Sequence, residues 1–302
     1  MGILDSIGNT PLVKLETLNT NPRVNIFAKL EGNNPGGSVK DRIALYMVRA
    51  AEEAGRIKKG DTILEATSGN TGIGLAMVGA ALGYKVVLVM PECVSHERRK
   101  ILEAFGAELI LSPGKEGTDG AIKLARRTMD ENSGKYFMPN QFDNPANILA
   151  HYETTGREII DQTNGKIDVF VAGMGTTGTL MGVGKRLKEF RSSIRVVGVE
   201  PLLGHKVQGL KNMQESIVPK IFNPAFPDEI VRVNDDDAFA TTRRLALEEG
   251  IFAGMSSGAA VFGALTMAGR IESGTIVVVL PDRGDRYLST ALFTSVCAKC
   301  PP

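Results

Sequence analysis

Residues 62–72 read Thr62-Ile63-Leu64-Glu65-Ala66-Thr67-Ser68-Gly69-Asn70-Thr71-Gly72, a short apolar run followed by a glycine-rich loop. The run predicts a strand over residues 62–65, and the loop leads into a helical pattern over residues 72–82. The same unit recurs at once, with strands expected over residues 85–90 and 108–111. Short strands that alternate with helices pair in parallel through right-handed crossovers. The sequence therefore predicts an α/β fold built on parallel sheets.

The alternation extends in both directions from this unit. It breaks at residues 137–145, a polar segment rich in Asn and Pro, where we expect a domain edge. Residues 201–227 show no regular period, and loops of that length are usually lids or substrate loops. The other expected strands cover residues 24–30, 167–172, 195–200, 229–233 and 275–280, and the other expected helices cover residues 42–54, 97–105, 119–130, 154–162, 179–190, 235–249 and 259–268.

The composition is that of an ordinary globular protein. Of 302 residues, 43% are hydrophobic and 23% are charged, and the formal net charge is +1. A charge so close to zero gives no electrostatic reason to expect nucleic acid or an anionic membrane as a partner. We find no segment that resembles a signal peptide and no apolar run near the roughly 20 residues that span a bilayer. We therefore expect a cytoplasmic protein with small-molecule partners.

Cysteine and histidine are too sparse to predict a metal or disulfide site. The three cysteines are too few for a disulfide framework. Cys297-Ala298-Lys299-Cys300 forms a C-x-x-C with no second pair and no histidine after it, so we expect no metal or redox role there. The three histidines are far apart in sequence and lack ligand spacing, which disfavours a zinc site.

One lysine stands out in residues 33–42, which read Asn33-Asn34-Pro35-Gly36-Gly37-Ser38-Val39-Lys40-Asp41-Arg42. Lys40 follows a turn of Pro and two glycines and directly precedes a helix, where the helix dipole disfavours its charged form. Burial or the neighbouring Arg42 would act in the same direction and leave a nucleophilic amine. The main covalent use of such an amine is a Schiff base with a carbonyl, most commonly pyridoxal phosphate. The alternative is a solvated lysine in the first turn of a helix capped by Ser38.

Three loops rich in Gly, Ser and Thr are expected at the carboxyl ends of strands, where open parallel sheets bind ligands. Residues 67–72 offer hydroxyls, an amide and backbone N–H groups, which suit a carboxylate. Residues 173–179 follow an apolar strand and open a helix, which suits a dianionic phosphate. Residues 254–258 again precede a helix. Each loop could equally be a capped turn.

Lys40 and these loops together resemble the fold type II family of pyridoxal-phosphate enzymes, the tryptophan synthase β-like fold. Within that family the chain resembles the cysteine synthases, or O-acetylserine sulfhydrylases. The resemblance spans nearly the whole chain and rests on residues 8–12, 34–42, 67–72, 90–92, 97–99, 141–147, 151–156, 175–179, 254–258 and 281–290.

The resemblance implies an architecture of two open, twisted, mainly parallel sheets flanked by helices. It also implies two domains. Residues 41–145 form a smaller, mobile α/β domain that carries the substrate loop. Residues 1–40 and 146–302 form a larger α/β domain that carries the phosphate site of the cofactor.

The resemblance also implies a role for particular residues. Lys40 is the Schiff-base lysine and the acid and base at Cα. Asn70 meets the ring hydroxyl of pyridoxal 5'-phosphate and Ser256 meets its ring nitrogen, with Asp282 also at the cofactor. The phosphate is held by Gly175, Thr176, Thr177, Gly178 and Thr179, and the substrate carboxylate by Thr67, Ser68, Gly69, Thr71 and Gln141.

The implied reaction converts O-acetyl-L-serine or O-phospho-L-serine and sulfide to L-cysteine through an α-aminoacrylate intermediate. Residues 205–209 resemble A-type cysteine synthases, whereas residues 210–215 and 251–254 resemble the B-type and O-phosphoserine-using branch. We hypothesise that Lys211 meets the leaving group; the alternative is a solvated loop lysine.

Other readings stay open at this point. A cystathionine β-synthase-like or serine dehydratase-like lyase has the same fold, and a cofactor-binding protein without turnover is a third reading. The family implies a homodimer. No residue pattern identifies the sulfur donor, or a serine acetyltransferase or sulfur-carrier protein as a partner.

Overall fold

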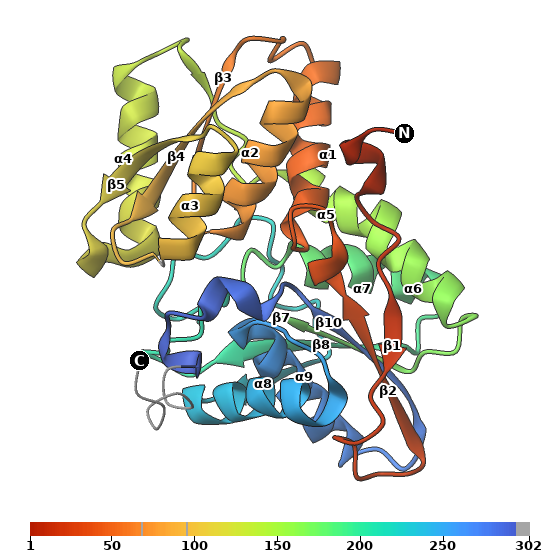
Figure 1. The fold of residues 1–302 in the computed structure, drawn as a ribbon. Coiled ribbons are helices and arrows are strands. Elements are labelled where there is room, and N and C mark those ends of the chain that lie inside the picture. The colour runs from red at the N-terminus through yellow and green to blue at the C-terminus, as the bar shows by residue number, and fades with distance from the viewer. Residues whose placement is uncertain (68, 95, 294–302) are drawn as a thin grey trace.

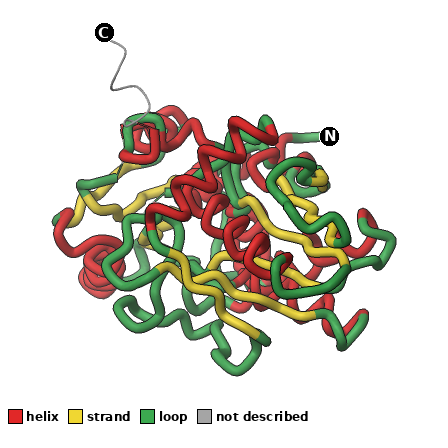
Figure 2. The backbone as a smooth tube through the Cα atoms, turned by 90° about the horizontal axis from the view of Figure 1, so that it is seen from below, coloured by secondary structure: helices red, strands yellow, loops and turns green. Residues whose placement is uncertain are grey.

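Two β-sheets organise the chain, and helices flank both of them (Figure 1). The structure is a computed structural model that describes residues 1–67, 69–94 and 96–293. Figure 2 shows the same arrangement from below, with the strands in yellow and the helices in red. Among the described residues, no helix is long and apolar enough to cross a membrane.

The smaller sheet has four parallel strands in the order β5-β4-β3-β6. Its strands are β3 (Thr62–Ala66), β4 (Lys85–Pro91), β5 (Glu108–Ser112) and β6 (Tyr136–Phe137). Its helices are α1 (Lys40–Glu53), α2 (Asn70–Leu82), α3 (His96–Ala104) and α4 (Gly117–Glu131).

Burial on both faces explains why the strands of this sheet are continuously apolar. In β4, Val86, Leu88 and Met90 pack into a core shared with α1 and α2. Val87 and Val89 point the other way, into a core shared with α4. Successive side chains of a strand alternate between faces, so a sheet covered on both sides needs apolar residues at every position.

The larger sheet has six strands in the order β1-β2-β10-β7-β8-β9, of which only β1 is antiparallel to its neighbour. Its strands are β1 (Leu12–Lys14), β2 (Val24–Leu30), β7 (Val169–Gly173), β8 (Arg195–Pro201), β9 (Glu229–Val233) and β10 (Gly274–Leu280). Its helices are α5 (Pro145–Ala150), α6 (Gly156–Gln162), α7 (Gly178–Phe190), α8 (Asp235–Glu249) and α9 (Met255–Ala268). In β7, Phe170 faces the core shared with α7, and Val171 faces the core shared with α9.

The predicted fold class is confirmed: the protein is α/β, with two mainly parallel sheets flanked by helices. The expected irregular stretch is also confirmed, because residues 202–228, all of which the structure describes, contain no helix or strand. The C-x-x-C at Cys297 and Cys300 lies outside the described residues.

The predicted start of a helix was wrong where the first turns show no regular spacing of apolar residues. We expected a polar loop before a helix at residue 154, but α5 begins at Pro145 and continues through the π-helical turn η4 (His151–Thr155) into α6. The side chain of Asn144 accepts a hydrogen bond from Ala146 N at 2.9 Å, and proline occupies the first helical position. An Asn cap followed by Pro is a strong start signal. The helix α9 likewise begins at Met255 rather than at residue 259.

Candidate active site

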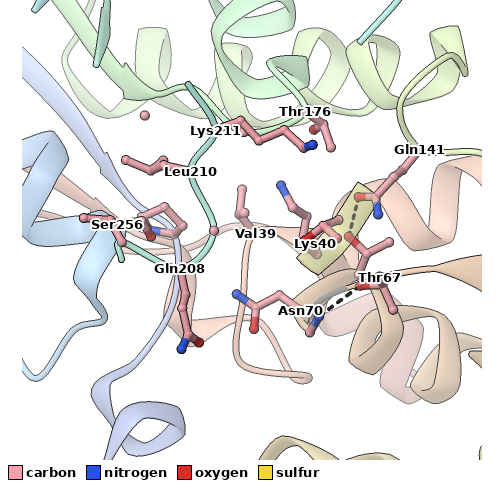
Figure 3. Close-up of a pocket in the computed structure, with 18 of the residues that line it drawn as sticks. Val39, Lys40, Thr67, Asn70, Gln141, Thr176, Gln208, Leu210, Lys211 and Ser256 are labelled. Carbon is pink, nitrogen blue, oxygen red and sulfur yellow. Dashed lines mark hydrogen bonds between the residues drawn. The ribbon is translucent and has the colours of Figure 1, made fainter. Parts of the chain in front are cut away.

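A cavity of about 390 Å³ collects the predicted site residues from both sheets (Figure 3). The described residues of the smaller-sheet loops that line it include Thr67, Gly69, Asn70, Thr71 and Gln141. Those from the larger-sheet side include Lys40, Gly175, Thr176, Thr177, Thr179, Lys211 and Ser256. Ser68, expected at the substrate carboxylate, lies outside the described residues.

Lys40 is the first residue of α1, and its side chain faces this cavity. In the close-up it lies between Thr176 and Asn70 (Figure 3). Burial of the ammonium lowers the pKa of Lys40 to about 8, although the carboxylate of Asp282 opposes that shift. A lysine with this pKa is partly neutral near neutral pH and is a nucleophile. Lys40 is half-buried and lies in the lining of the cavity, which disfavours the alternative of a solvated first-turn lysine.

Arg42 does not act on Lys40 as the sequence led us to expect. Its guanidinium forms ion pairs with Glu31 at 2.7 Å and with Glu158 at 2.6 Å. Both carboxylates lie within a buried network that also holds Lys29. The charge of Arg42 is therefore compensated, and burial is the main cause of the lowered pKa of Lys40.

Backbone contacts fix the loop that carries Lys40. Val39 N–H donates to Pro281 O at 2.8 Å, which ties the loop to the end of β10. Gly36 N–H donates to Asp41 Oδ2 at 2.6 Å, and Gly37 has a φ of 80°. A positive φ is strained for residues with a Cβ, so the Pro-Gly-Gly turn has a conformational reason.

Asn70 is held by a polar network that runs along the cavity wall. Its Nδ2 donates to Asp282 Oδ2 at 2.6 Å, and its Oδ1 accepts from Arg286 Nη1 at 2.6 Å. Tyr287 OH also donates to Asp282 Oδ2 at 2.6 Å. The amide of Asn70 is thereby fixed in one orientation, and Asp282 lies next to it rather than in the lining of the cavity.

The loop of residues 175–179 forms the amino-terminal end of α7. A Cβ added at Gly175 would lie 2.6 Å from Gly209 O, and one at Gly178 would overlap Asn147 Oδ1. Thr177 has a φ of 66°, which is unusual for a β-branched residue. Backbone strain of this kind is common at ligand sites, and the end of a helix that presents free N–H groups attracts anions.

Two residues that the sequence left without a role support this loop. Asn147 Nδ2 donates to Thr176 Oγ1 at 3.1 Å, and His151 Nε2 lies 3.2 Å from Thr179 Oγ1. Burial lowers the pKa of His151 to about 3, so its imidazole is neutral. Both residues lie in segments that carried the resemblance, and that was the only sequence signal for them.

The loop of residues 67–72 contacts the segment around Gln141 through the side chain of Thr71. Thr71 Oγ1 donates to Gln141 Oε1 at 2.6 Å, and Gln141 Nε2 donates to Ala66 O at 3.2 Å. The hydroxyl of Thr67 accepts from Gly69 N at 3.0 Å. These hydroxyl and amide groups lie together in the lining of the cavity.

Lys211 is buried, and the alternative of a solvated loop lysine is wrong. Its Nζ lies 3.1 Å from Asp119 Oδ1 and 5.2 Å from the ring centre of Phe142. Arg98, which the sequence gave no separate role, also lines the cavity and lies over the ring of Tyr287. Among the described residues, three cationic side chains, Arg98, Lys206 and Lys211, therefore border this cavity in addition to Lys40.

Known proteins resemble this chain over almost its whole length. The family model for "Pyridoxal-phosphate dependent enzyme" matches residues 3–282. A cysteine synthase of Staphylococcus aureus (strain Mu50 / ATCC 700699) is 51% identical, and the match covers 97% of this chain and 96% of that protein.

Two crystal structures of other proteins resemble this fold. That of O-ureido-L-serine synthase has a TM-score of 0.92 at 45% identity and covers 97% of this chain and 95% of that one. That of a cysteine synthase (OASS) from Entamoeba histolytica has a TM-score of 0.90 at 44% identity and covers 97% and 90%. The site geometry and these matches lead to one conclusion: the chain belongs to the family of pyridoxal-phosphate-dependent enzymes.

Proposed function

We propose that this protein is a cysteine synthase, which replaces the β-substituent of an activated L-serine with sulfide to give L-cysteine. The observation that carries the proposal is the position of Lys40. Its partly neutral amine faces a cavity that also presents a helix end suited to a phosphate and hydroxyl and amide groups suited to an amino-acid carboxylate. The similarity to cysteine synthases supports the same function.

The residues fit pyridoxal phosphate. Thr177 Oγ1 is buried and has no hydrogen-bond partner among the described residues, and its hydroxyl can donate to a phosphate oxygen. Donors and acceptors left over in this way indicate a missing polar partner. The phosphate would be held by the loop of residues 175–179, and the ring by Asn70 and Ser256, with Asp282 fixing the amide of Asn70. When bound, the cofactor supplies an aldehyde that captures amines and a ring that withdraws electrons from the substrate Cα.

Side chains of the protein carry out proton transfer and substrate binding. Lys40 Nζ accepts the proton from the substrate Cα and later returns it, which a lysine can do when its pKa lies near the working pH. Thr67, Thr71 and Gln141, with Gly69 and Ser68, bind the substrate carboxylate and so orient the Cα–H bond toward Lys40. Ser256 lines the cavity, and its neutral hydroxyl would hold the ring nitrogen without forcing that nitrogen to be protonated.

Closure of the site belongs to the same proposal. Residues 41–145 act as a mobile domain that moves against residues 1–40 and 146–302 and excludes water from the cavity. The two separate sheets, each with its own hydrophobic core, support this division. Arg98 Nη1 donates to Gln208 Oε1 at 2.5 Å between the two parts, a contact that opening would break.

In this proposal the ammonium of Lys211 binds the leaving group. This allows O-phospho-L-serine as well as O-acetyl-L-serine to be a substrate. Its burial at the cavity supports the assignment, because a partly desolvated cation binds a phosphate more strongly than an exposed one.

We also propose a homodimer, which light scattering of the purified protein tests.

The structural similarity to O-ureido-L-serine synthase favours a second candidate function. O-ureido-L-serine carries an oxygen substituent at Cβ, so a β-replacement would form it with hydroxyurea as the nucleophile. The cavity lining does not distinguish sulfide from such a nucleophile, whereas the product does.

Product analysis tests the proposal. The holoenzyme is incubated with O-acetyl-L-serine and with sulfide, hydroxyurea, homocysteine or no nucleophile, and the amino-acid products and pyruvate are quantified. We expect cysteine to form with the highest kcat/KM. Predominant O-ureido-L-serine would establish the second candidate. Predominant cystathionine or pyruvate would instead make the protein a lyase of the cystathionine β-synthase-like or dehydratase-like kind.

A further inference from the structure

One carboxylate, beside the cavity, connects a helix of the smaller sheet to a loop of the larger sheet. Asp119 lies in the first turn of α4, which packs on the smaller sheet. Its Oδ1 lies 3.1 Å from Lys211 Nζ, and its Oδ2 accepts a hydrogen bond from Ile217 N at 3.1 Å. Lys211 and Ile217 belong to the irregular loop of residues 202–228, which follows β8 of the larger sheet. Asp119 therefore holds this loop against α4.

The ion pair is partly shielded from solvent. The side chain of Lys211 is 11% exposed and that of Asp119 is 29% exposed. The ammonium also lies over the ring of Phe142, and the backbone N–H of Lys211 donates to Met174 O at 2.8 Å. Lys211 is thus fixed at the cavity wall, and its charge is already compensated by Asp119 before any ligand enters.

The ion pair between Lys211 and Asp119 affects the binding of a dianionic leaving group but not that of a neutral one. A dianionic phosphate gains from Lys211 only if it competes with Asp119 for the ammonium, and it must approach a carboxylate to do so. An acetyl ester is neutral until it leaves, so it meets neither cost on binding. The residues just before Asp119, Gly117 and Thr118, line the cavity, which places this competition at the substrate site.

We propose that Asp119 is a specificity-determining positioning residue, which acts through Lys211 to favour neutral over dianionic leaving groups. The inference rests on the proposed function, in which Lys211 meets the leaving group. Removal of the Asp119 charge frees the ammonium for a phosphate. Asp119→Asn removes the charge and keeps an oxygen that accepts from Ile217 N, whereas Asp119→Glu keeps the charge.

The test compares kcat/KM for O-phospho-L-serine and O-acetyl-L-serine, with sulfide, at low ionic strength. We expect Asp119→Asn to raise the ratio of the two values at least about tenfold, and added salt to reduce this gain, because salt screens partly exposed charges. Asp119→Glu should keep the wild-type ratio. Where the wild type does not use O-phospho-L-serine at all, Asp119→Asn should acquire that activity.

A double mutant separates action through Lys211 from direct repulsion. Lys211→Met keeps a long apolar stem against Phe142, and in that background Asp119→Asn should leave the ratio unchanged. The inference is overturned if Asp119→Asn leaves the ratio unchanged or lowers it, or if the ratio rises equally in the Lys211→Met background.

The chain offers a matched control in Asp228. This carboxylate also pairs with a lysine, Lys188 at 2.8 Å, and also accepts a backbone hydrogen bond, from Val196 N at 2.7 Å. It lies outside the cavity lining, so Asp228→Asn should leave the ratio at the wild-type value. A wild type that makes no cysteine from either substrate contradicts the proposed function. A wild type that makes cysteine, with a ratio that does not respond to Asp119→Asn, contradicts only this inference.

Discussion

Thr71 donates its hydroxyl hydrogen to Oε1 of Gln141 at 2.6 Å, and this contact joins the amino-terminal end of α2 to the loop before α5. Both residues are buried at the cavity, far apart in sequence. The pair keeps the amide of Gln141 in one orientation, with Nε2 directed to Ala66 O. A substrate carboxylate would therefore meet the remaining N–H of the Gln141 amide in a fixed orientation.

Removal of the Gln141 amide should weaken substrate binding more than turnover. We expect Gln141→Ala to raise KM for O-acetyl-L-serine about tenfold to a hundredfold, because a hydrogen bond to a charged group contributes about 1.5–3 kcal/mol. Cofactor affinity should stay unchanged. Gln214→Ala, at an exposed glutamine, serves as the control in the same steady-state assay. An unchanged KM in Gln141→Ala would remove this residue from the substrate site.

His151 should support cofactor binding through Thr179 and should do so without titrating. We expect His151→Ala to weaken pyridoxal-phosphate affinity about tenfold, because Thr179 loses the partner 3.2 Å from its hydroxyl. In the wild type this affinity should show no step from His151 between pH 5 and pH 8, since burial keeps its pKa at about 3. Fluorescence titration of the apo-protein measures both effects, with the exposed His96→Ala as control. Equal affinities in wild type and His151→Ala would refute the role.

The buried carboxyl of Glu65 should make the protein less stable as pH rises. Burial raises the pKa of Glu65 to about 8 from the ordinary 4.5, although backbone N–H groups near Asn140 and Gln141 oppose the shift. Between these two pH values the folded state keeps a proton that the unfolded state loses, so stability contributed by this group is present below pH 4.5 and falls until about pH 8.

Glu65→Gln should therefore gain stability relative to the wild type by a few kcal/mol between pH 5 and pH 8, since each unit of pKa difference corresponds to about 1.4 kcal/mol. Chemical denaturation at several pH values measures the difference. Glu53→Gln, at an exposed position at the end of α1, should show no such trend. A pH-independent difference between Glu65→Gln and the wild type would contradict the assigned protonation.

The reactivity of Lys40 should follow its lowered pKa. The neutral amine is the nucleophile, so uptake of pyridoxal phosphate by the apo-protein should accelerate as pH rises through about 8. Asp282→Asn removes the charge that raises this pKa and should move the transition to lower pH. Stopped-flow absorbance follows the uptake, and a rate that is constant from pH 6.5 to pH 9 would exclude the partly neutral lysine.

Local patterns predicted most of the fold. The strands β4, β7 and β10 were visible because burial on both faces leaves a nearly unbroken apolar run. The site loops were visible because glycine and hydroxyl residues gather where strands end. The helix α5 was not visible, because its start depends on the Asn144 cap rather than on apolar spacing.

Contacts between distant segments could not be predicted from the amino-acid composition or from the spacing of apolar residues. The partners of Asn147, His151 and Asp119 lie 29, 28 and 92 residues away along the chain. Only the packing of α4, α5 and α7 around the two sheets brings these pairs together. The same holds for Arg42, whose partner Glu158 is 116 residues away and whose pairing withdraws it from Lys40.

The most direct test of the account is the formation of cysteine by the wild type and by Lys40→Ala. Both holoproteins are given O-acetyl-L-serine and sulfide, and cysteine is quantified against Lys59→Ala, which alters an exposed lysine. We predict that the wild type and Lys59→Ala form cysteine at similar rates and that Lys40→Ala loses at least about a thousandfold in rate, as expected for loss of a general base. Turnover by Lys40→Ala at the wild-type rate would contradict the central claim.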